Sequence, residues 1–360
     1  MPMAPGLRPA LSLAALVLVA PAMAQTNLLQ EASQRFQPVV SSGGMVAAQE
    51  ARAAAVGAQI LRQGGNAVDA AVAASFALAV TLPQAGNLGG GGFLVLWLPQ
   101  GSAAAAAEPL PQARAIGRGV AVAVNFREMA PLAARPDLFL RPDGSVDRER
   151  ATRSLLSTAV PGTVAGLSLV QRRYGRLPLR VVVQPAVTLA AQGFPVGVEL
   201  SESLQAAAPL LKADPSSARQ FFKADGTAYR PGEILRQPLL AASLRRIASE
   251  GEAGFYRGPV AAALTALMRH RGGLITQADL DRYRAQWLSP LQGQFRGYRV
   301  VTMPPPSGGG ATLLQLLNVL APLDLGRTGL NSAASLHPMV EAMNLAYRDR
   351  NRLLGDPDQV

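Results

Sequence analysis

"NLGGGGFLVLWLP", residues 87–99, is the stretch that decides the fold of this chain. Four consecutive glycines lead directly into the apolar run Phe93–Leu98, which has the length of a buried strand. A dinucleotide-binding fingerprint has the opposite order, because its glycines follow a strand and open a helix. We therefore predict a strand at 93–98 and no Rossmann domain.

The four glycines, Gly89, Gly90, Gly91 and Gly92, allow two interpretations. A tight turn needs one or two glycines, because glycine adopts positive φ angles without strain. A run of four also lets another backbone approach closely, which favours a ligand or a second chain segment lying against this one. The residues alone leave both interpretations open.

Two helices are expected before this stretch. The segment "MVAAQEARAAAVGAQIL" (45–61) has high helix propensity, and the glycines of "RQGGN" (62–66) end it. Asn66 and Asp69 have the spacing of a capping box, so a second helix is predicted to open at Asn66. Small residues on nearly every side of this second helix predict that it is buried.

The rest of the chain is expected to contain a second strand, further helices and a strand pair. We predict that 93–98 and 120–126 are neighbours in one sheet packed under the two helices, and that the low-complexity segment 101–119 is a mobile surface loop. The later elements are a helix from Pro161 to Gly175, a helix capped by Thr276 and Asp279, a strand pair or one bent strand at 292–306, and helices at 308–320 and 332–350. Because strands and helices do not alternate regularly, the predicted fold class is α+β.

Composition and motifs exclude several function classes. The chain of 360 residues contains no cysteine, which excludes disulfides and thiolate chemistry. Its net charge of +11 comes from scattered arginines without interleaved aromatic residues, so no nucleic-acid partner is expected. The two histidines, His270 and His337, have no partners at ligand spacing, and no nucleophile elbow or phosphate loop occurs. We therefore expect neither a metal nor a cofactor.

The first residues have the order of a secretory signal. Arg8 precedes the apolar segment Leu11–Ala20, and Ala22, Met23 and Ala24 form a small-residue cleavage pattern. The apolar run is about half as long as a membrane span requires. We predict a signal peptide at 1–24 that is cleaved after Ala24, no stable membrane span, and a periplasmic or secreted location.

"AVAVNFREMAP" (121–131) places Arg127 just beyond the end of the second predicted strand. A guanidinium can bind a carboxylate through two parallel hydrogen bonds, which an ammonium group cannot do. The alternative is an internal ion pair with Glu128 or another acid. "MPPPSGGG" (303–310) likewise has two interpretations, an anion site at a helix N-terminus or a stiff structural corner.

Taken together, these segments resemble the γ-glutamyltranspeptidase family. The matching pieces cover essentially all of 40–358 in the family's order, and strings of this length are highly specific. They are residues 44–93, "NFREMAP" (125–131), "PGTVAGL" (161–167), "GGLITQADL" (272–280), "RGYRVVTMPPPSGGG" (296–310) and "YRDRNRLLGDPD" (347–358).

The resemblance implies an N-terminal-nucleophile hydrolase with a four-layer αββα sandwich, of which residues 25–360 are the large-subunit region. Members are exported precursors that cut themselves into two subunits. The N-terminal Thr of the small subunit attacks a γ-glutamyl amide such as that of glutathione, and the acyl group then passes to water or to an acceptor amino acid or peptide. A β-lactam side-chain acylase of the same family is the alternative activity.

Carried onto this sequence, the resemblance implies that Arg127 binds the α-carboxylate of the γ-glutamyl group. Glu128 and the glycines Gly89, Gly90, Gly91 and Gly92 are possible supporting residues. Asn125 stands where relatives often carry Asp, and 101–119 is longer than the usual loop.

By the resemblance, this sequence ends before the segment that carries the nucleophilic Thr. No catalytic residue is therefore expected within 1–360, and this chain alone should be inactive and prone to aggregate without its small subunit. The chain is interpreted either as a fragment of a longer protein or as a truncated, non-catalytic exported remnant.

Overall fold

The structure, a computed structural model, describes residues 39–102, 105 and 110–358. The chain divides into two units, Met1–Gly43 and Gly44–Val360, and the helices and strands given below belong to the second. The predicted signal peptide, 1–24, and part of the predicted loop 101–119 lie outside the described residues. Among the residues described, no helix has both the length and the apolar character that crossing a membrane requires.

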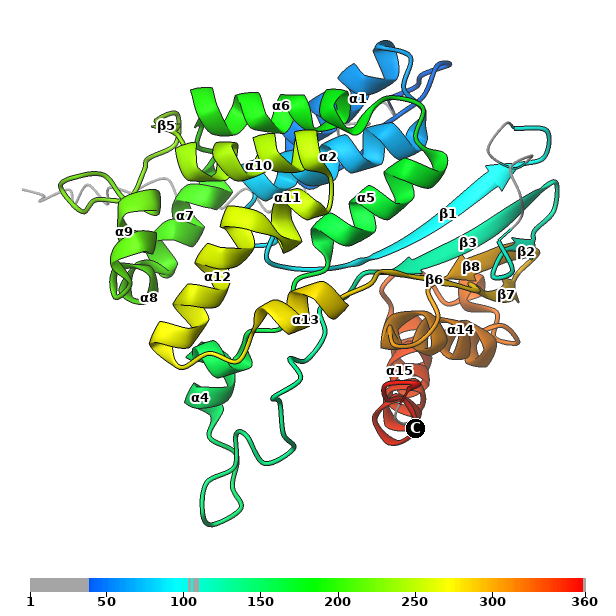
Figure 1. The fold of residues 1–360 in the computed structure, drawn as a ribbon. Helices are drawn as coiled ribbons and strands as arrows, with labels where there is room; N and C mark the ends of the chain where they lie inside the picture. The colour runs from blue at the N-terminus through cyan, green and yellow to red at the C-terminus, as the bar shows by residue number, and fades with distance from the viewer. Residues whose placement is uncertain (1–38, 103–104, 106–109, 359–360) are drawn as a thin grey trace, which may run out of the picture. The chain divides into compact units, whose positions relative to one another are not determined.

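The elements follow one another along the chain as labelled in Figure 1. Up to residue 212 they are α1 (Ala51–Arg62), α2 (Ala67–Thr81), β1 (Phe93–Pro99), β2 (Arg114–Ala115), β3 (Gly119–Asn125), α4 (Arg148–Arg153), the 3-10 helix η2 (Leu155–Ser157), α5 (Thr163–Tyr174), α6 (Leu179–Gln192), β4 (Phe194–Pro195), α7 (Val198–Ala206) and α8 (Ala208–Lys212). After it they are α9 (Pro215–Phe221), β5 (Ile234–Leu235), α10 (Pro238–Glu250), α11 (Ala253–Tyr256), α12 (Gly258–Arg271), α13 (Gln277–Arg282), β6 (Gln286–Leu288), β7 (Leu291–Phe295), β8 (Tyr298–Thr302), α14 (Gly308–Leu320), the 3-10 helix η3 (Leu325–Arg327) and α15 (Ala333–Leu353).

The two predicted N-terminal helices are present, but the first begins at Ala51 instead of Met45. Glu50 ends the preceding extended segment, because its carboxylate accepts a hydrogen bond from the Ala53 N–H at 3.0 Å and so caps the helix. The capping box that opens α2 is confirmed: Asn66 accepts from the Asp69 N–H at 3.0 Å, and Asp69 accepts from the Asn66 N–H at 2.7 Å.

Asp69 does more than cap α2, since its carboxylate is fully buried. It also accepts hydrogen bonds from the main-chain N–H groups of Arg176 and Leu177 and from the Gln171 side-chain amide. One side chain therefore joins the start of α2 to the loop between α5 and α6.

The predicted sheet is confirmed. β1 and β3 pair antiparallel, with Phe93 opposite Asn125 and Leu98 opposite Val120. The other edge of β3 pairs with β2 near its start and with β6 near its end, where Asn125 lies opposite Gln286. The end of β3 is therefore supported on both edges by strands, which fixes the position of the residues that follow it.

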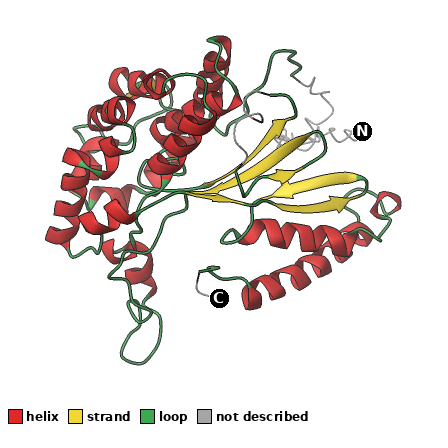
Figure 2. Ribbon diagram, turned by 45° about the vertical axis from the view of Figure 1, so that its right-hand side comes forward, coloured by secondary structure: helices red, strands yellow, loops and turns green. Residues whose placement is uncertain are grey.

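The core joins the helices to this sheet. α1 packs on α2, α2 on α6, and α6 on α10, and Figure 1 shows these helices gathered on one side of the sheet. Val122 and Val124 of β3 belong to the same hydrophobic cluster as Phe76 of α2 and Leu244 of α10. Figure 2 shows α14 and α15 packed on each other, away from the other helices.

Four of the later predicted elements are confirmed, and the start of a fifth is wrong. The strand pair is β7 and β8, joined by a tight turn in which Arg296 and Gly297 both have positive φ. Helices α14 and α15 cover 308–320 and 332–350, apart from the N-cap Ser332, and Thr276 caps α13 together with Asp279. Helix α5 begins at Thr163, not at Pro161, because Gly162 is its N-cap.

Candidate functional site

The site is built around residues 125–128, which we call the strand-end segment because they begin with the last residue of β3. Asn125 is the last residue of β3, and its side-chain oxygen accepts a hydrogen bond from the Arg127 N–H at 3.0 Å. This bond to the residue two positions ahead is an Asx turn, which redirects the chain out of the strand. Asparagine provides the acceptor oxygen without a charge, so this turn does not require an Asp at 125.

Glycines surround Phe126 on the inner side of the strand-end segment. Gly92 and Phe126 exchange two main-chain hydrogen bonds, at 3.0 and 3.2 Å. A Cβ at Gly91 would lie 2.5 Å from the Phe126 carbonyl oxygen and 2.8 Å from the Glu128 nitrogen. The neighbour of this glycine run is thus a second chain segment, which agrees with one of the two sequence-based interpretations.

Gly89 and Gly90 do not pack against the strand-end segment as Gly91 does. The nearest atom to a Cβ on either residue would be the Asn87 side-chain oxygen, so neither Cβ position faces the strand-end segment. The Gly90 carbonyl, however, accepts hydrogen bonds from the N–H groups of Gly162 and Thr163, at 2.7 and 3.0 Å. Gly90 therefore anchors the start of α5, whereas Gly91 and Gly92 contact the strand-end segment itself.

The start of α5 also packs against the strand-end segment, through Gly162 and Gly166. A Cβ at Gly162 would overlap the Phe126 carbonyl oxygen and the Tyr283 hydroxyl, and one at Gly166 would overlap the Phe126 ring. Phe126 is 7% exposed. These contacts allow no displacement of the strand-end backbone toward α5, because packed interiors leave no room for an added methyl group.

The side chain of Arg127 is exposed beyond this rigid backbone. One guanidinium nitrogen donates to the Pro306 carbonyl at 3.4 Å, and the guanidinium carbon lies 6.0 Å from the centre of the Phe93 ring. Within the described residues, no Asp or Glu forms an ion pair with Arg127, Glu128 included. The guanidinium therefore keeps donors available for an external anion.

The start of α14 lies next to Arg127, since Pro306 comes two residues before Gly308. The three glycines 308–310 form the first turn of α14, and the N-cap Ser307 makes no side-chain cap bond. A Cβ at Gly308 would lie 2.9 Å from Nε of Arg350. A helix N-terminus and two arginines make this part of the surface electropositive, but the choice between an anion site and a structural corner at 303–310 stays open.

Glu128 is exposed, and its charge acts on a tyrosine from another part of the chain. Tyr283 donates its hydroxyl hydrogen to the Arg127 carbonyl at 2.8 Å. Burial, and then the negative charge of Glu128, raise the pKa of Tyr283. The hydroxyl therefore stays protonated and remains a hydrogen-bond donor.

A second tyrosine supports the first. The rings of Tyr256 and Tyr283 are stacked, with centres 5.8 Å apart and planes 3° from parallel. The Tyr256 hydroxyl donates to the Pro161 carbonyl at 2.8 Å, and its pKa is raised, chiefly by burial. The sequence analysis did not identify either tyrosine, because "FYRG" and "DRYR" contain no local pattern that marks them. The two glycines of "PGTVAGL" (161–167), which lie close to these tyrosines in the fold, were the one available signal of a close approach between chain segments.

The capping carboxylate of α13 fixes the chain just after the strand-end segment. Asp279 accepts hydrogen bonds from the Leu132 N–H at 2.6 Å and from the Thr276 hydroxyl and N–H, at 2.6 and 2.7 Å. Burial alone would raise the pKa of Asp279, but these bonds to Leu132 and Thr276 outweigh it and lower that pKa. Asp279 therefore remains a carboxylate and ties α13 to the chain beyond Met129.

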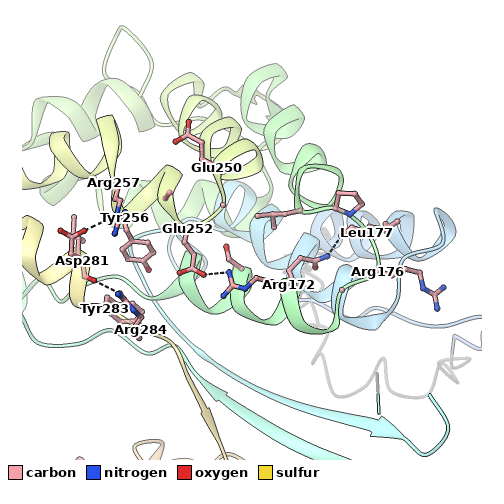
Figure 3. A pocket seen from close by; sticks show the side chains of 18 residues that line it. Arg172, Arg176, Leu177, Glu250, Glu252, Tyr256, Arg257, Asp281, Tyr283 and Arg284 are labelled. Carbon is pink, nitrogen blue, oxygen red and sulfur yellow. Dashed lines mark hydrogen bonds and ion pairs between the residues drawn. The ribbon is translucent and has the colours of Figure 1, made fainter. Parts of the chain in front are cut away.

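A cavity of about 950 Å³ lies between α5 and the α11–α13 region, and Figure 3 shows its lining side chains. Two ion pairs border it, Arg172 with Glu252 at 3.0 Å and Arg257 with Asp281 at 3.5 Å. Arg127 is not among its lining residues, although Tyr283 is. Over the described part of the chain, no group of three or more His, Asp or Glu side chains is arranged to hold a metal ion.

Comparison with known proteins identifies the family of the chain. Residues 53–360 match the family profile described as gamma-glutamyltranspeptidase. The chain is 43% identical over 325 residues to the glutathione hydrolase proenzyme of Escherichia coli (strain K12), an alignment that covers 90% of this chain and 53% of that protein. It is 37% identical over 327 residues to the acylase ACY 1 proenzyme of Pseudomonas sp. (strain V22), covering 89% of this chain and 55% of that protein.

A solved structure shares the fold. The crystal structure of Helicobacter pylori gamma-glutamyltranspeptidase superposes with a TM-score of 0.83 at 37% identity, covering 90% of this chain and 88% of the solved one. The predicted α+β class of N-terminal-nucleophile type is thereby confirmed. The chain spans about half the length of the curated relatives it matches. These matches place the chain in the gamma-glutamyltranspeptidase family.

Proposed function

We propose that this chain is the large-subunit part of an exported, self-cleaving γ-glutamyl hydrolase and transferase, and that Arg127 binds the α-carboxylate of the γ-glutamyl donor. One observation carries the proposal. Arg127 is an exposed guanidinium without an ion-pair partner among the described residues, on a backbone fixed by two strands and by glycine contacts.

The chemistry of the guanidinium suits this role. Its planar fork can form two parallel, charge-assisted hydrogen bonds to a carboxylate, which fixes both the position and the rotation of the donor substrate. The Phe93 ring and the Pro306 carbonyl both contact the guanidinium, so a carboxylate can reach it only from the sides that they leave open. Gly91 and Gly92 support Arg127 by packing against the strand-end segment. Glu128 places a negative charge next to Arg127 in the chain.

The remaining parts of the reaction are assigned to the second subunit. In this proposal a Thr at the N-terminus of that subunit attacks the γ-glutamyl amide, for example that of glutathione. Water or an acceptor amino acid or peptide then takes the acyl group. The residues of this chain bind and orient the donor, and the signal predicted at 1–24 directs export.

The test uses the complete product of the gene. Release of p-nitroaniline from γ-glutamyl-p-nitroanilide is followed for the wild type and for Arg127→Lys, while self-cleavage is followed on a denaturing gel. We expect Arg127→Lys to lower kcat/KM at least about tenfold with self-cleavage intact, because a charge-assisted bond contributes about 1.5–3 kcal/mol and 1.4 kcal/mol equals a factor of ten. Unchanged kinetics would remove Arg127 from the site.

A second candidate activity is supported by the 37% identity to an acylase proenzyme. A β-lactam side-chain acylase would use the same guanidinium for the carboxylate of a dicarboxylic side chain. Assaying the same purified protein with a glutaryl-substituted β-lactam amide separates the two activities. Faster turnover of that amide than of the γ-glutamyl anilide would favour the acylase.

A further inference from the structure

Both main-chain polar groups of Arg127 are bound by side chains. Its N–H donates to the Asn125 side-chain oxygen at 3.0 Å, and its carbonyl accepts from the Tyr283 hydroxyl at 2.8 Å. Two nearby residues are bound differently: Phe126, just before Arg127, bonds to the main chain of Gly92, and Met129, two residues after it, bonds to that of Val160. Side chains thus fix Arg127 where the sheet ladder no longer does.

Tyr283 is itself fixed in one orientation. It is 5% exposed, and its ring stacks on Tyr256, whose hydroxyl lies against the start of α5 through Pro161 and Ala165. Gly162 leaves the space that the Tyr283 hydroxyl occupies. Figure 3 shows the two labelled tyrosines close together at one end of the cavity.

The exposed side chain of Arg127 has no comparable restraint. Its contact with the Pro306 carbonyl is long, at 3.4 Å, and its approach to the Phe93 ring is loose, at 6.0 Å. An arginine side chain has many rotamers, and ordering it costs free energy. Where the guanidinium meets a ligand therefore depends on how firmly the Arg127 main chain is fixed.

We propose that Tyr283 and Asn125 are positioning residues, which fix the Arg127 main chain so that its guanidinium meets the substrate carboxylate in one geometry. This inference rests on the proposed function. Neither residue touches the substrate in this arrangement, so their effect is on donor binding through Arg127 and not on the acyl-transfer chemistry. The persistent protonation of the Tyr283 hydroxyl keeps its bond to Arg127 intact.

The experiment measures KM and kcat of the complete gene product with γ-glutamyl-p-nitroanilide. We expect Tyr283→Phe to raise KM about fivefold with kcat within about twofold, as the loss of one neutral hydrogen bond predicts. Asn125→Ala should behave in the same way, and Asn125→Asp, which keeps the acceptor oxygen, should restore KM to within about twofold. Tyr174→Phe is the matched control, because Tyr174 is also buried but packs edge-on against Trp287.

A double-mutant cycle separates positioning from a general loss of stability. In an Arg127→Ala background there is no guanidinium to place, so Tyr283→Phe should change kcat/KM by less than about twofold. A merely structural role would lower the melting temperature and the active fraction equally in both backgrounds, with KM unchanged. That result would overturn the inference, and so would an unchanged KM in both Tyr283→Phe and Asn125→Ala.

Failure of the proposed function gives a different pattern. If Arg127→Ala leaves kcat/KM unchanged, the carboxylate site itself is wrong. If Arg127→Ala is strongly impaired while Tyr283→Phe and Asn125→Ala both match the wild type, the site stands and only the positioning role is wrong. Asn125→Ala keeps the test decisive should Tyr283→Phe not accumulate as folded protein.

Discussion

The strand-end segment and the layer of helices α1, α2, α6 and α10 are both well packed, but by different means. In the helices, side chains fill the space between elements: Phe76, Leu244 and Ile247 are fully buried. In the strand-end segment, main chain lies directly on main chain, with Gly91 and Gly162 against the Phe126 carbonyl. Side-chain packing can adjust through rotamers, whereas main-chain packing cannot. The chain uses the stiffer arrangement where it carries Arg127.

The largest effect that this comparison predicts comes from one added methyl group. Gly162→Ala places a Cβ on the Phe126 carbonyl oxygen and the Tyr283 hydroxyl. We expect the free energy of unfolding to fall by about 3 kcal/mol or more, because the obstruction on one side is backbone that cannot change rotamer. Urea unfolding of the complete protein measures this change.

Gly197→Ala is the matched control, because Gly197 has φ −82° and no atom within 4 Å of its Cβ position. It should change the free energy of unfolding by less than about 0.5 kcal/mol. Equal effects of the two substitutions would show that the strand-end segment is no stiffer than the exposed start of α7.

The next effect tests the helical layer. Asp69→Asn replaces a fully buried carboxylate that accepts from the main chain of Asn66, Arg176 and Leu177 and from Gln171. The amide N–H₂ of the new side chain then faces some of these donors. We therefore expect the free energy of unfolding to fall by about 2–3 kcal/mol, the range for hydrogen bonds to a charged group. Kinetic constants per folded enzyme should remain unchanged, since Asp69 belongs to the helical layer. A raised KM would contradict the separation of the two regions.

Acid titration tests Asp279, the carboxylate that accepts from the Leu132 N–H just beyond the strand-end segment. The pKa of Asp279 is lower in the folded chain than its ordinary value, so its stabilisation is present above that ordinary value, about 3.9, and is lost as pH falls through the lower folded pKa. Asp279→Asn should destabilise the protein by about 2 kcal/mol at pH 7. The difference between the two proteins should shrink as pH falls below about 4. A constant difference down to pH 2 would show that ionised Asp279 is not what holds Leu132.

The smallest effect is expected from a change of shape in the helical layer. Leu244→Met keeps the side-chain volume of a fully buried residue in α10. It should lower the free energy of unfolding by less than about 1.5 kcal/mol, because the flexible methionine side chain fits irregular spaces. Thermal unfolding measures it, and a cost equal to that of Gly162→Ala would remove the contrast between the two regions.

The sequence predicted the elements whose signals are local. Asn66 with Asp69 and Thr276 with Asp279 have capping-box spacing, and both boxes form. The run Phe93–Leu98 and its partner strand were identified from length and apolar character alone. The first helix was extended too far, because alanine-rich propensity at 45–49 outweighed the cap provided by Glu50.

The candidate site could be predicted only in part. Arg127 was identified because a lone arginine follows an apolar strand, and the resemblance gave it a role. Tyr283 could not be found in this way, since its bond to Arg127 joins residues 156 positions apart and leaves no periodic pattern in either segment. The bond from Asn125 to Arg127 is local, and an Asn two residues before the arginine was a signal that could have been used.

The separation of Tyr283 from Arg127 has a consequence for synthesis of the chain. A ribosome adds about 5–20 residues per second, so the tyrosine emerges roughly 8–30 s after the arginine. Strand β6, which completes the edge of β3 at Asn125, emerges later still. During that interval the Arg127 carbonyl lacks its hydrogen bond from Tyr283, and the surroundings of Arg127 are completed only when the chain has been translated as far as β6.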